Sequence, residues 1–340
     1  MGVTRDDVAR VAGVSPATVS YVVNNGPRPV APETRARVLA AIEQLGYNPS
    51  AIARSLKTKK TNAVGIIISD MVNPYLGAIA QAAQDQLLEQ DYSLSVCNSN
   101  ESQERELVWL RMLMHHRVDG LILLPTGGNL RLLASLAETG PMLVLIDREI
   151  PELQTDTVLM DNEGGVYAAV RHLINLGHRR IALLNLPRDL TPGRERLAGY
   201  TRALTEAGLS VSSELIREGP FSAEHASELV GDLLDTHPAP TAIFACSNRL
   251  ARGVLQQVKI RRLVMPDDLA LFVFDEVDYY AWLTPSVSAV EVSGAELGQR
   301  AVSLMIERLS GSYTGPPRLA RIPYRLHPRE SSDGNSWGTI

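Results

Sequence analysis

Acidic and histidine side chains that could do chemistry are available in the long C-terminal part of this 340-residue chain. Asp147, Asp161, His172, His178 and Asp275 are of the types used for general acid–base catalysis. They form no nucleophile–base pair at a recognisable spacing. His178, in LGHRR before an apolar run, is more simply a residue that ends a helix or bonds backbone groups. We therefore expect no enzymatic activity and no catalytic residue.

The sequence patterns that coenzymes and metals require are missing. ISDMVNP follows the first strong apolar run, where a dinucleotide-binding chain would carry G-x-G-x-x-G, and no Walker A sequence occurs. Cys97 and Cys246 lack the spacing of zinc ligands. We expect no cofactor and no metal. We also expect reduced thiols and a cytoplasmic protein, because MGVTRDD is unlike a secretory signal and no apolar run is long enough to span a membrane.

Alternating apolar runs and amphipathic stretches predict the elements that position these side chains. The expected strands are 64–68, 94–96, 120–124, 143–147, 181–184, 242–245 and 269–274, and the expected helices are 75–90, 101–116, 129–139, 163–176, 194–207, 222–236 and 248–258. Such alternation is typical of parallel sheets covered by helices on both faces. Because residues 61–340 are many for one sheet, we expect two α/β lobes.

Open parallel sheets bind ligands beyond the carboxyl ends of their strands. This rule selects Ser69–Tyr75, Asp147–Arg148, Leu190–Arg196, Ser247–Asn248 and Asp275. Arg196 can donate two parallel hydrogen bonds to a carboxylate or to vicinal hydroxyls, and Asp275 can accept from hydroxyls or an amine. The alternative for this pair is a salt bridge across a cleft.

The segment TRDDVARVAGVSPATVSYVVN, which begins at Thr4, has the pattern of two short helices joined by a tight turn. Thr4 can cap the first helix with Asp7 three residues on, which is the spacing of a capping box. Val8 and Val11 should then share one apolar face of this helix. Gly13 permits the positive φ that the turn needs.

The second helix of the segment should have Ser15 as its N-cap and Pro16 in its first turn. Its apolar stripe should consist of Val19, Val22 and Val23. Its outward side chains should be Ala17, Thr18, Ser20 and Tyr21. Small outward side chains let a helix approach base edges and phosphates closely, so the pair is interpreted as a helix-turn-helix that binds DNA. The alternative is an ordinary helical hairpin in a core.

A third helix and a basic segment follow. Pro32 can open the helix ETRARVLAAIEQLGY, and Gly46 lies near its end. Its inner side should carry Val38, Leu39, Ile42 and Leu45. The next segment, SAIARSLKTKKT, is too short to be stable as an isolated helix, and its basic residues suggest that it orders against phosphates.

The charge of the chain is unevenly distributed. Residues 1–60 carry nine Lys or Arg and four Asp or Glu, a net charge of +5, while the whole chain carries −5, so residues 61–340 carry −10. A small basic head on an acidic body fits a module that binds a polyanion.

These residues resemble the lactose-repressor family of bacterial transcription regulators. The head carries DDVARVAGVSPATVSYVVN and ETRARVLAAIEQLGYNPSAIARSLKTKKT, and the body carries NAVGIIISDMVNPYLGAI, HHRVDGLILLP, VLIDREIP, MDNEGGVYAAVRHLINLGHRRIALL, RERLAGYTRAL, TAIFACSN and LTPSVSAV in the family's order. The resemblance covers residues 3–332. It implies an N-terminal all-α helix-turn-helix three-helix bundle with a hinge helix, followed by an α/β bilobed core, like a periplasmic binding protein, with two parallel sheets.

The resemblance also implies an organisation and a function. We expect a helix-turn-helix domain at 1–46, a hinge at 47–60, an effector-binding and dimerisation core of two interleaved lobes at 61–332, and a polar tail at 333–340. The implied function is a transcriptional regulator, most simply a repressor, that binds a palindromic double-stranded DNA operator as a homodimer. A small-molecule effector between the lobes would switch operator affinity; a sugar or sugar derivative is the commonest case in the family, and a nucleobase is the main alternative.

Site residues follow from the matched positions. The DNA-binding candidates are Thr4, Ser15, Pro16, Ala17, Thr18, Ser20, Tyr21, Asn24, Ala53, Leu56 and Lys57. The effector-binding candidates are Asn73, Tyr75, Asp147, Arg196, Phe221, Asn248 and Asp275. Tyr75, Phe221 and Trp282 could stack on the apolar face of a sugar, with core packing as the alternative for Phe221 and Trp282.

Four positions depart from the family's pattern. Tyr21 stands where most members have an arginine that contacts bases, and tyrosine cannot make the bidentate contact with guanine. Ala31 replaces the usual Ser or Thr cap of the third helix. Arg249 replaces a common Asp, an exchange that would invert the local polarity of a pocket, and Val273 replaces a common Gly. These changes leave the operator sequence and the effector open.

A function of another class also stays open. The body would fit a small-molecule sensor or solute-binding protein whose head is a protein-interaction domain. A steep fall of duplex affinity with salt, together with a sequence preference, would separate a DNA-binding regulator from this alternative. The tail PRESSDGNSWGTI has no heptad pattern, so we expect no coiled-coil tetramer.

Leu56 aligns with the family residue that enters the minor groove at the operator centre, where an apolar wedge pries apart a base step. Packing against the partner's helix is the alternative, and both can hold at once. If the effector changes the angle between the lobes, the coil–helix balance of the two hinges would set operator affinity. We predict that Leu56→Ala sharply weakens specific operator binding and leaves effector affinity nearly unchanged. Fluorescence anisotropy and effector titration measure the two, and unaltered operator binding would refute the hinge hypothesis.

Overall fold

The computed structural model describes residues 3–23, 28–47, 60–219 and 222–333. The chain forms two compact units, Met1–Thr61 and Asn62–Ile340, called here the head and the body. Most of the predicted hinge therefore lies outside the described residues. The same holds for five of the predicted site residues: Asn24, Ala53, Leu56, Lys57 and Phe221.

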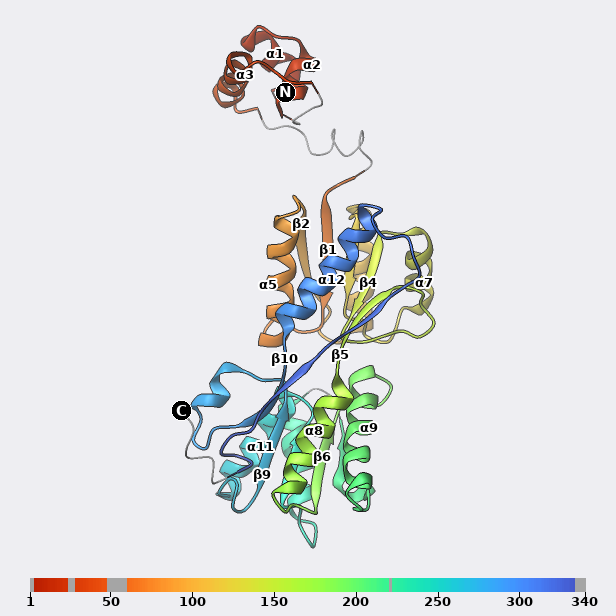
Figure 1. Ribbon diagram of the computed structural model, residues 1–340, viewed down its shortest axis with the longest axis vertical. Helices are drawn as coiled ribbons and strands as arrows, with labels where there is room; N and C mark the ends of the chain where they lie inside the picture. The colour runs from red at the N-terminus through yellow and green to blue at the C-terminus, as the bar shows by residue number, and fades with distance from the viewer. Residues whose placement is uncertain (1–2, 24–27, 48–59, 220–221, 334–340) are drawn as a thin grey trace. The chain divides into compact units, whose positions relative to one another are not determined.

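The head contains the three predicted helices, α1 (Arg5–Ala12), α2 (Pro16–Val23) and α3 (Pro32–Leu45) (Figure 1). The local signals that set their ends are confirmed. Thr4 and Asp7 form both hydrogen bonds of a capping box, and Gly13 ends α1 with φ of 64°. The Ser15 hydroxyl accepts from the Thr18 amide at 3.1 Å and so caps α2. As expected for an alanine, Ala31 gives α3 no side-chain cap.

The apolar faces of α1 and α3 are rotated from the prediction. Val11 and Leu39 are exposed, although both were expected to face the core. The helices bury the alanines beside these positions instead. Ala9 and Ala12 of α1 pack in one cluster with Ala41 of α3, and small side chains there let the helices approach closely. The head core is completed by Val8, Val19, Val22 and Val38.

The body contains two six-stranded sheets, with strand orders β11-β5-β4-β3-β1-β2 and β12-β10-β9-β8-β6-β7 in the described chain. Lobe 1 is built on β1 (Ala63–Ile68), β2 (Ser93–Asn98), β3 (Gly120–Leu123), β4 (Met142–Ile146), β5 (Asp156–Met160) and β11 (Leu319–Ile322). Lobe 2 is built on β6 (Ile181–Asn185), β7 (Ile216–Glu218), β8 (Ala242–Ala245), β9 (Ala270–Phe274), β10 (Ser288–Val292) and β12 (Tyr324–His327). The two orders match strand for strand, so each position in one sheet has a counterpart in the other.

Helices flank both sheets, as predicted. Those of lobe 1 are α5 (Pro74–Leu88), α6 (Gln103–His115), α7 (Leu130–Thr139) and α12 (Gly294–Leu309). Those of lobe 2 are α8 (Asn162–Asn175), α9 (Thr191–Glu206), α10 (Ala223–Leu234) and α11 (Asn248–Arg261), with the short 3₁₀ helices η1 (Ser213–Leu215) and η2 (Asp278–Trp282). The strands pair in parallel except β12, which runs antiparallel to β10.

The chain passes between the lobes after β5, after β10 and again between β11 and β12 (Figure 1). The resemblance implied interleaved lobes, but the sequence interpretation did not locate the three crossings, because it named no element after Phe274 and placed no strand at β5 or β7. β7 is three residues long, and most residues of β11 and β12 are at least partly exposed. None of these three strands therefore gives a long apolar run. The crossings matter for function because a movement of one lobe must bend three connections together.

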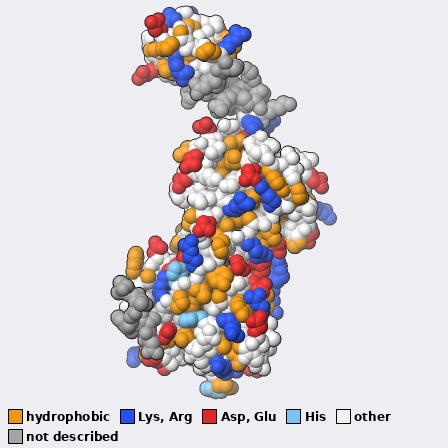
Figure 2. All heavy atoms as spheres, viewed as in Figure 1, with side chains coloured by type: hydrophobic (Ala, Val, Ile, Leu, Met, Phe, Trp, Pro, Cys, Tyr) orange, Lys and Arg blue, Asp and Glu red, His pale blue; other side chains and the backbone are white. Residues whose placement is uncertain are grey.

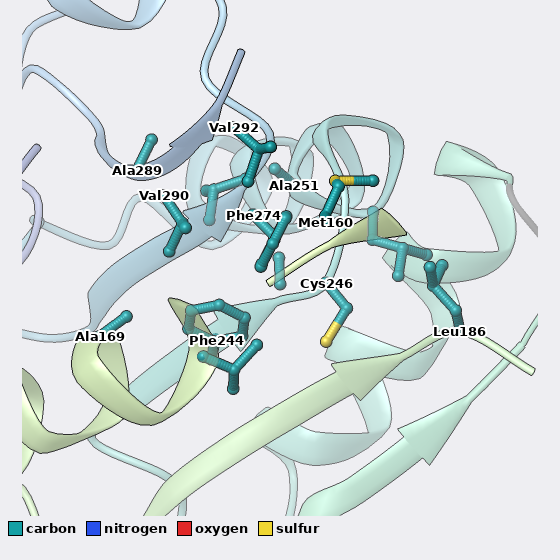
Figure 3. Packing of buried hydrophobic residues seen from close by; sticks show 14 of the residues in the cluster. Met160, Ala169, Leu186, Phe244, Cys246, Ala251, Phe274, Ala289, Val290 and Val292 are labelled. Carbon is teal, nitrogen blue, oxygen red and sulfur yellow. The ribbon is translucent and has the colours of Figure 1, made fainter. Parts of the chain in front are cut away.

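The central strands of both sheets are buried on both faces, as their continuous apolar runs indicate, whereas the edge strands are partly exposed. In β1, Ile66 and Ile68 pack in the large core cluster, while Ile67 packs in a second cluster on the opposite face. The large cluster continues into lobe 2, where Cys246 and Phe274 are wholly buried (Figure 3).

Helices α10 and α11 approach most closely at Gly253. A Cβ at Gly253 would lie 2.6 Å from the Ala226 Cβ, whereas one at Gly231, on the same helix pair, meets its first neighbour at 3.6 Å. We predict that Gly253→Ala lowers the free energy of unfolding by about 1–3 kcal/mol through overpacking. Gly231→Ala should leave it unchanged or raise it by up to about 1 kcal/mol, since alanine favours the helix. Urea unfolding followed by circular dichroism measures both. Equal stability of the two variants would contradict the close approach.

Candidate functional site

A cleft between the lobes lies at the carboxyl ends of the central strands. Its volume is about 560 Å³, including the part open to solvent. Six of the seven predicted effector residues line it: Asn73, Tyr75, Asp147, Arg196, Asn248 and Asp275. Phe221, the seventh, is outside the described residues. Trp282 does not line the cleft; its side chain is 79% exposed on η2, so neither stacking in this cleft nor core packing describes it.

Asp147 and Asp275 occupy equivalent places in the two lobes. Asp147 follows β4 and Asp275 follows β9, and these strands hold the same position in the two sheets. Both residues have a left-handed backbone conformation, with φ of 64° at Asp147 and 75° at Asp275. Both are also buried. Non-glycine residues in this region carry strain, and such strain is characteristic of binding sites.

Burial dominates the electrostatics of these two carboxyls. It raises the pKa of Asp147 to about 6 against the opposing pull of Arg148 and Arg196, and the Asp275 and Glu101 carboxylates raise it further. Burial likewise raises the pKa of Asp275. Asp147 Oδ1 is among the buried side-chain atoms of the described chain that have no hydrogen-bond partner.

Tyr75 contributes a second unsatisfied polar atom. Its Oη is buried without a hydrogen-bond partner in the described structure. Burial first, and then the nearby Asp147 and Asp275 carboxylates, raise the pKa of Tyr75 well above its ordinary value. The hydroxyl therefore stays protonated and can donate. Asn73 precedes it as the N-cap of α5, where its Oδ1 accepts from the Tyr75 amide at 3.0 Å.

Arg196 is held mainly by lobe 2, although its Nη2 also donates to Met160 Sδ of lobe 1 at 3.9 Å. Its Nε donates to Asn162 Oδ1 at 2.8 Å, and its Nη1 donates to the Cys246 carbonyl. Its Cζ lies 3.7 Å from the centre of the Phe274 ring. The Nη2 of Arg196 is 4.0 Å from Asp275 Oδ1. The salt bridge considered as an alternative therefore lies within lobe 2 and does not cross the cleft.

Two pairs of lining residues do bridge the cleft. Asn248 Nδ2 donates to Asn73 Oδ1 at 3.1 Å, and Arg249 forms a salt bridge with Asp70. Arg249 was recognised from the sequence as a departure in charge, but Asp70 as its partner was not foreseen. These contacts join the start of α11 in lobe 2 to the loop after β1 in lobe 1.

Glu101 is a lining residue that the sequence interpretation missed. It accepts two hydrogen bonds from Arg148, at 2.9 and 2.7 Å. Burial alone would raise the pKa of Glu101, but these bonds lower it below its ordinary value. Glu101 stands shortly after β2, so the strand-end rule would have found it had the rule been applied to that strand.

The predicted DNA-binding residues of the head that are described lie at the starts of α1 and α2 and along α2. Pro16 and Ala17 are exposed. Thr18, Ser20 and Tyr21 are half-buried, so they face outward less fully than predicted. At the start of α1, the Thr4 hydroxyl, followed by its amide and by Arg10, lowers the pKa of Asp7 to about 2.

Charged side chains of both signs lie interspersed over the visible face of the body (Figure 2). In the described chain, no cluster of three or more His, Cys, Asp or Glu is arranged to hold a metal ion. Within the same ranges, no helix is both long and apolar enough to cross a membrane.

Comparison with known proteins matches both units. Residues 4–50 match the model of bacterial regulatory proteins of the lacI family, and residues 170–332 match the periplasmic binding protein-like domain. The HTH-type transcriptional repressor PurR of Haemophilus influenzae (strain PittEE) is 34% identical over 322 residues, 94% of this chain and 95% of PurR. The probable HTH-type transcriptional regulator EndR of Paenibacillus polymyxa is 32% identical over 331 residues, 96% of each protein.

Solved structures give the same result. A lac repressor dimer bound to operator and the anti-inducer ONPF superposes with a TM-score of 0.85 at 26% identity, covering 98% of this chain and 99% of the repressor chain. The transcriptional regulator CelR in complex with cellobiose superposes with a TM-score of 0.74 at 29% identity, covering 97% and 99%.

The raised pKa of Asp147 predicts a pH-dependent cost to stability. A carboxyl that titrates at 3.8 when unfolded and near 6 when folded contributes stability below pH 4 and loses it as the pH rises through 6. Asp147→Asn should therefore be more stable than the parent at pH 7.5, by up to about 3 kcal/mol, with the difference vanishing near pH 4. Thermal unfolding across this pH range measures it.

Asp156 is the matched control. Burial alone would raise its pKa, but hydrogen bonds from Arg308 and Arg318 lower it. Asp156→Asn should thus destabilise at pH 7.5, by about 3 kcal/mol or more, because it breaks a buried ion pair. A loss of stability at pH 7.5 in both variants would contradict the conclusion that burial of the ionised Asp147 carboxylate destabilises the folded protein.

Proposed function

Because the chain belongs to the lacI family of bacterial regulatory proteins, and so is a ligand-responsive DNA-binding transcriptional regulator, we propose that its effector is a sugar or sugar derivative bound in the cleft. The observation that carries this proposal is the set of buried acceptors and donors at the strand ends. Asp147, Asp275 and Asn248 suit hydroxyl groups, and Asp147 Oδ1 and Tyr75 Oη have no partner within the described chain.

The lining favours a sugar over a nucleobase. A flat base gains affinity by stacking on aromatic faces. Among the described lining residues, Tyr75 is the one aromatic side chain. Apart from Tyr75, the apolar lining residues are non-aromatic: Leu76, Leu124, Met160, Leu186 and Pro192. CelR, a structural neighbour, was solved with cellobiose, which is consistent with this choice.

DNA binding is assigned to the head. We place α2 in a major groove, with Ala17, Thr18, Ser20 and Tyr21 facing bases and phosphates and the start of α1 near the backbone. The basic charge of residues 1–60 supports this placement. A dimer would place two such helices on a palindromic site, and the lac repressor neighbour is a dimer bound to its operator.

The switch would act through the contacts between the lobes. A ligand that binds Asp147 in lobe 1 and Asp275 in lobe 2 together stabilises one lobe arrangement over another, since only a difference in affinity shifts such an equilibrium. The Asn73–Asn248 and Asp70–Arg249 pairs belong to the arrangement described. We assign the protein no catalytic activity and place it in the cytoplasm with its operator; its relatives are named as repressors and regulators.

Selection of duplexes from a random library by the full-length protein tests the function. We expect a two-fold symmetric site, an affinity that falls steeply with salt, and a change of about 5–150-fold when a sugar effector is added. Binding with a shallow salt dependence and no sequence preference would favour the sensor alternative.

Replacement of two exposed alanines by glutamate, one at a time, tests the surface of α2 in the same assay. Ala17 and Ala40 are both exposed on head helices, α2 and α3. Ala17→Glu should weaken operator binding by at least about tenfold, because it sets a carboxylate against phosphates. Ala40→Glu should change it by less than about twofold. Equal effects of the two substitutions would contradict the assignment of α2 as the recognition helix.

A further inference from the structure

The charges lining the cleft do not balance. Four carboxylates line it, Asp70, Glu101, Asp147 and Asp275, against three guanidiniums, Arg148, Arg196 and Arg249. With all of them ionised, the lining carries a net charge of −1. If the ligand is a sugar, as the proposed function holds, this imbalance decides which charge forms of a sugar can enter.

The guanidiniums are already engaged by the protein. Arg148 donates to both carboxylate oxygens of Glu101 and, at 3.0 Å, to the Pro125 carbonyl. Arg249 is paired with Asp70. As described above, Arg196 donates to an amide oxygen and a carbonyl of its own lobe. An anionic ligand would have to compete with these acceptors to gain a full ion pair.

Helix starts attract anions in many proteins, but two of those at the cleft, the starts of α5 and α11, are occupied by the protein's own oxygens. At α5, the Val72 amide donates to Asp70 Oδ1 at 3.1 Å, in addition to the cap that Asn73 provides. At α11, the Ser247 hydroxyl accepts from the Leu250 amide at 3.2 Å, and the Asn248 backbone donates to Asp275. At these two helix starts, the protein's own oxygens accept the amide hydrogen bonds that a phosphate or carboxylate would need.

The two buried carboxylates at the inner wall have the opposite preference. Asp147 Oδ1 is a buried acceptor that calls for a donor. Asp275, its counterpart from lobe 2, is a buried carboxylate that faces Arg196, with 4.0 Å between Asp275 Oδ1 and Arg196 Nη2. Hydroxyl and ammonium groups supply donors to such oxygens, whereas a ligand carboxylate or phosphate adds a further negative charge beside them.

We propose that the cleft binds its sugar only in a neutral or amine-bearing form, and that Asp147 and Asp275 exclude sugar acids and sugar phosphates. The two aspartates thus act as charge filters in addition to hydrogen-bonding the ligand. Arg249, which by its sequence position could have favoured an anion, is neutralised by Asp70.

The test uses matched sugars with the full-length protein at pH 7.5. For each of the gluco, galacto and manno configurations, the hexose, its 2-amino derivative, its uronic acid and its 6-phosphate are screened by thermal shift, and binders are titrated by calorimetry. Nucleosides are included in the screen. We expect binding in the neutral and amino forms of at least one configuration, with the acid and the phosphate at least about tenfold weaker.

Two variants assign the effect to the aspartates. Asp147→Asn and Asp275→Asn keep the shape of the side chain and remove one negative charge each. Each should therefore reduce the difference in affinity between the neutral sugar and its acid, called here the affinity gap, by about tenfold. Glu152→Gln removes one charge from an exposed residue of lobe 1 that does not line the cleft, and it should leave the affinity gap unchanged.

The outcomes separate the two proposals. Tighter binding of an acid or phosphate than of its neutral parent overturns the charge filter but leaves the sugar effector in place. An unchanged affinity gap in both aspartate variants also overturns the filter. Binding of nucleosides alone, or of no sugar in any form, overturns the proposed sugar effector itself.

Discussion

The ligand binding proposed for the body depends on the burial of carboxylates where its two sheets end at a common cleft. Asp147 and Asp275 leave the carboxyl ends of equivalent strands in a left-handed conformation and are almost out of reach of water. Burial of charge is costly unless it is compensated. Arg148, Arg196 and the start of α11 compensate only in part, and a raised pKa at both carboxyls is the consequence. A ligand that donates hydrogen bonds would supply the compensation that these two carboxylates lack within the protein.

This constraint links ligand binding to movement. The cleft is shared, so a ligand that satisfies Asp147 in lobe 1 and Asp275 in lobe 2 holds the lobes in one arrangement, which the Asp70–Arg249 salt bridge also favours. The chain crosses between the lobes after β5, after β10 and between β11 and β12, and these connections must bend together. Two close-packed lobes on shared connections favour discrete arrangements over continuous ones, as a switch requires.

How much of this was predictable depends on the range of the interactions. The Thr4–Asp7 capping box, the turn at Gly13 and the Ser15 cap follow from residues a few positions apart, and the sequence was sufficient for them. Strand ends were equally local, so Asp147 and Asp275 were found. The Asp70–Arg249 pair joins residues 179 positions apart, and no local pattern announces it. The exposure of Val11 and Leu39 was missed because the rotation of a short helix is set by alanines packing on a neighbouring helix.

The central claim is that sugar binding in the cleft and operator binding by the head are coupled, and thermodynamic reciprocity tests it most directly. If the sugar changes operator affinity by some factor, the operator must change sugar affinity by the same factor. Calorimetric titration of the sugar into the free protein and into the protein–operator complex measures this second factor. We predict two dissociation constants whose ratio equals the change in operator affinity measured independently by anisotropy. Identical constants in the two titrations would contradict the account.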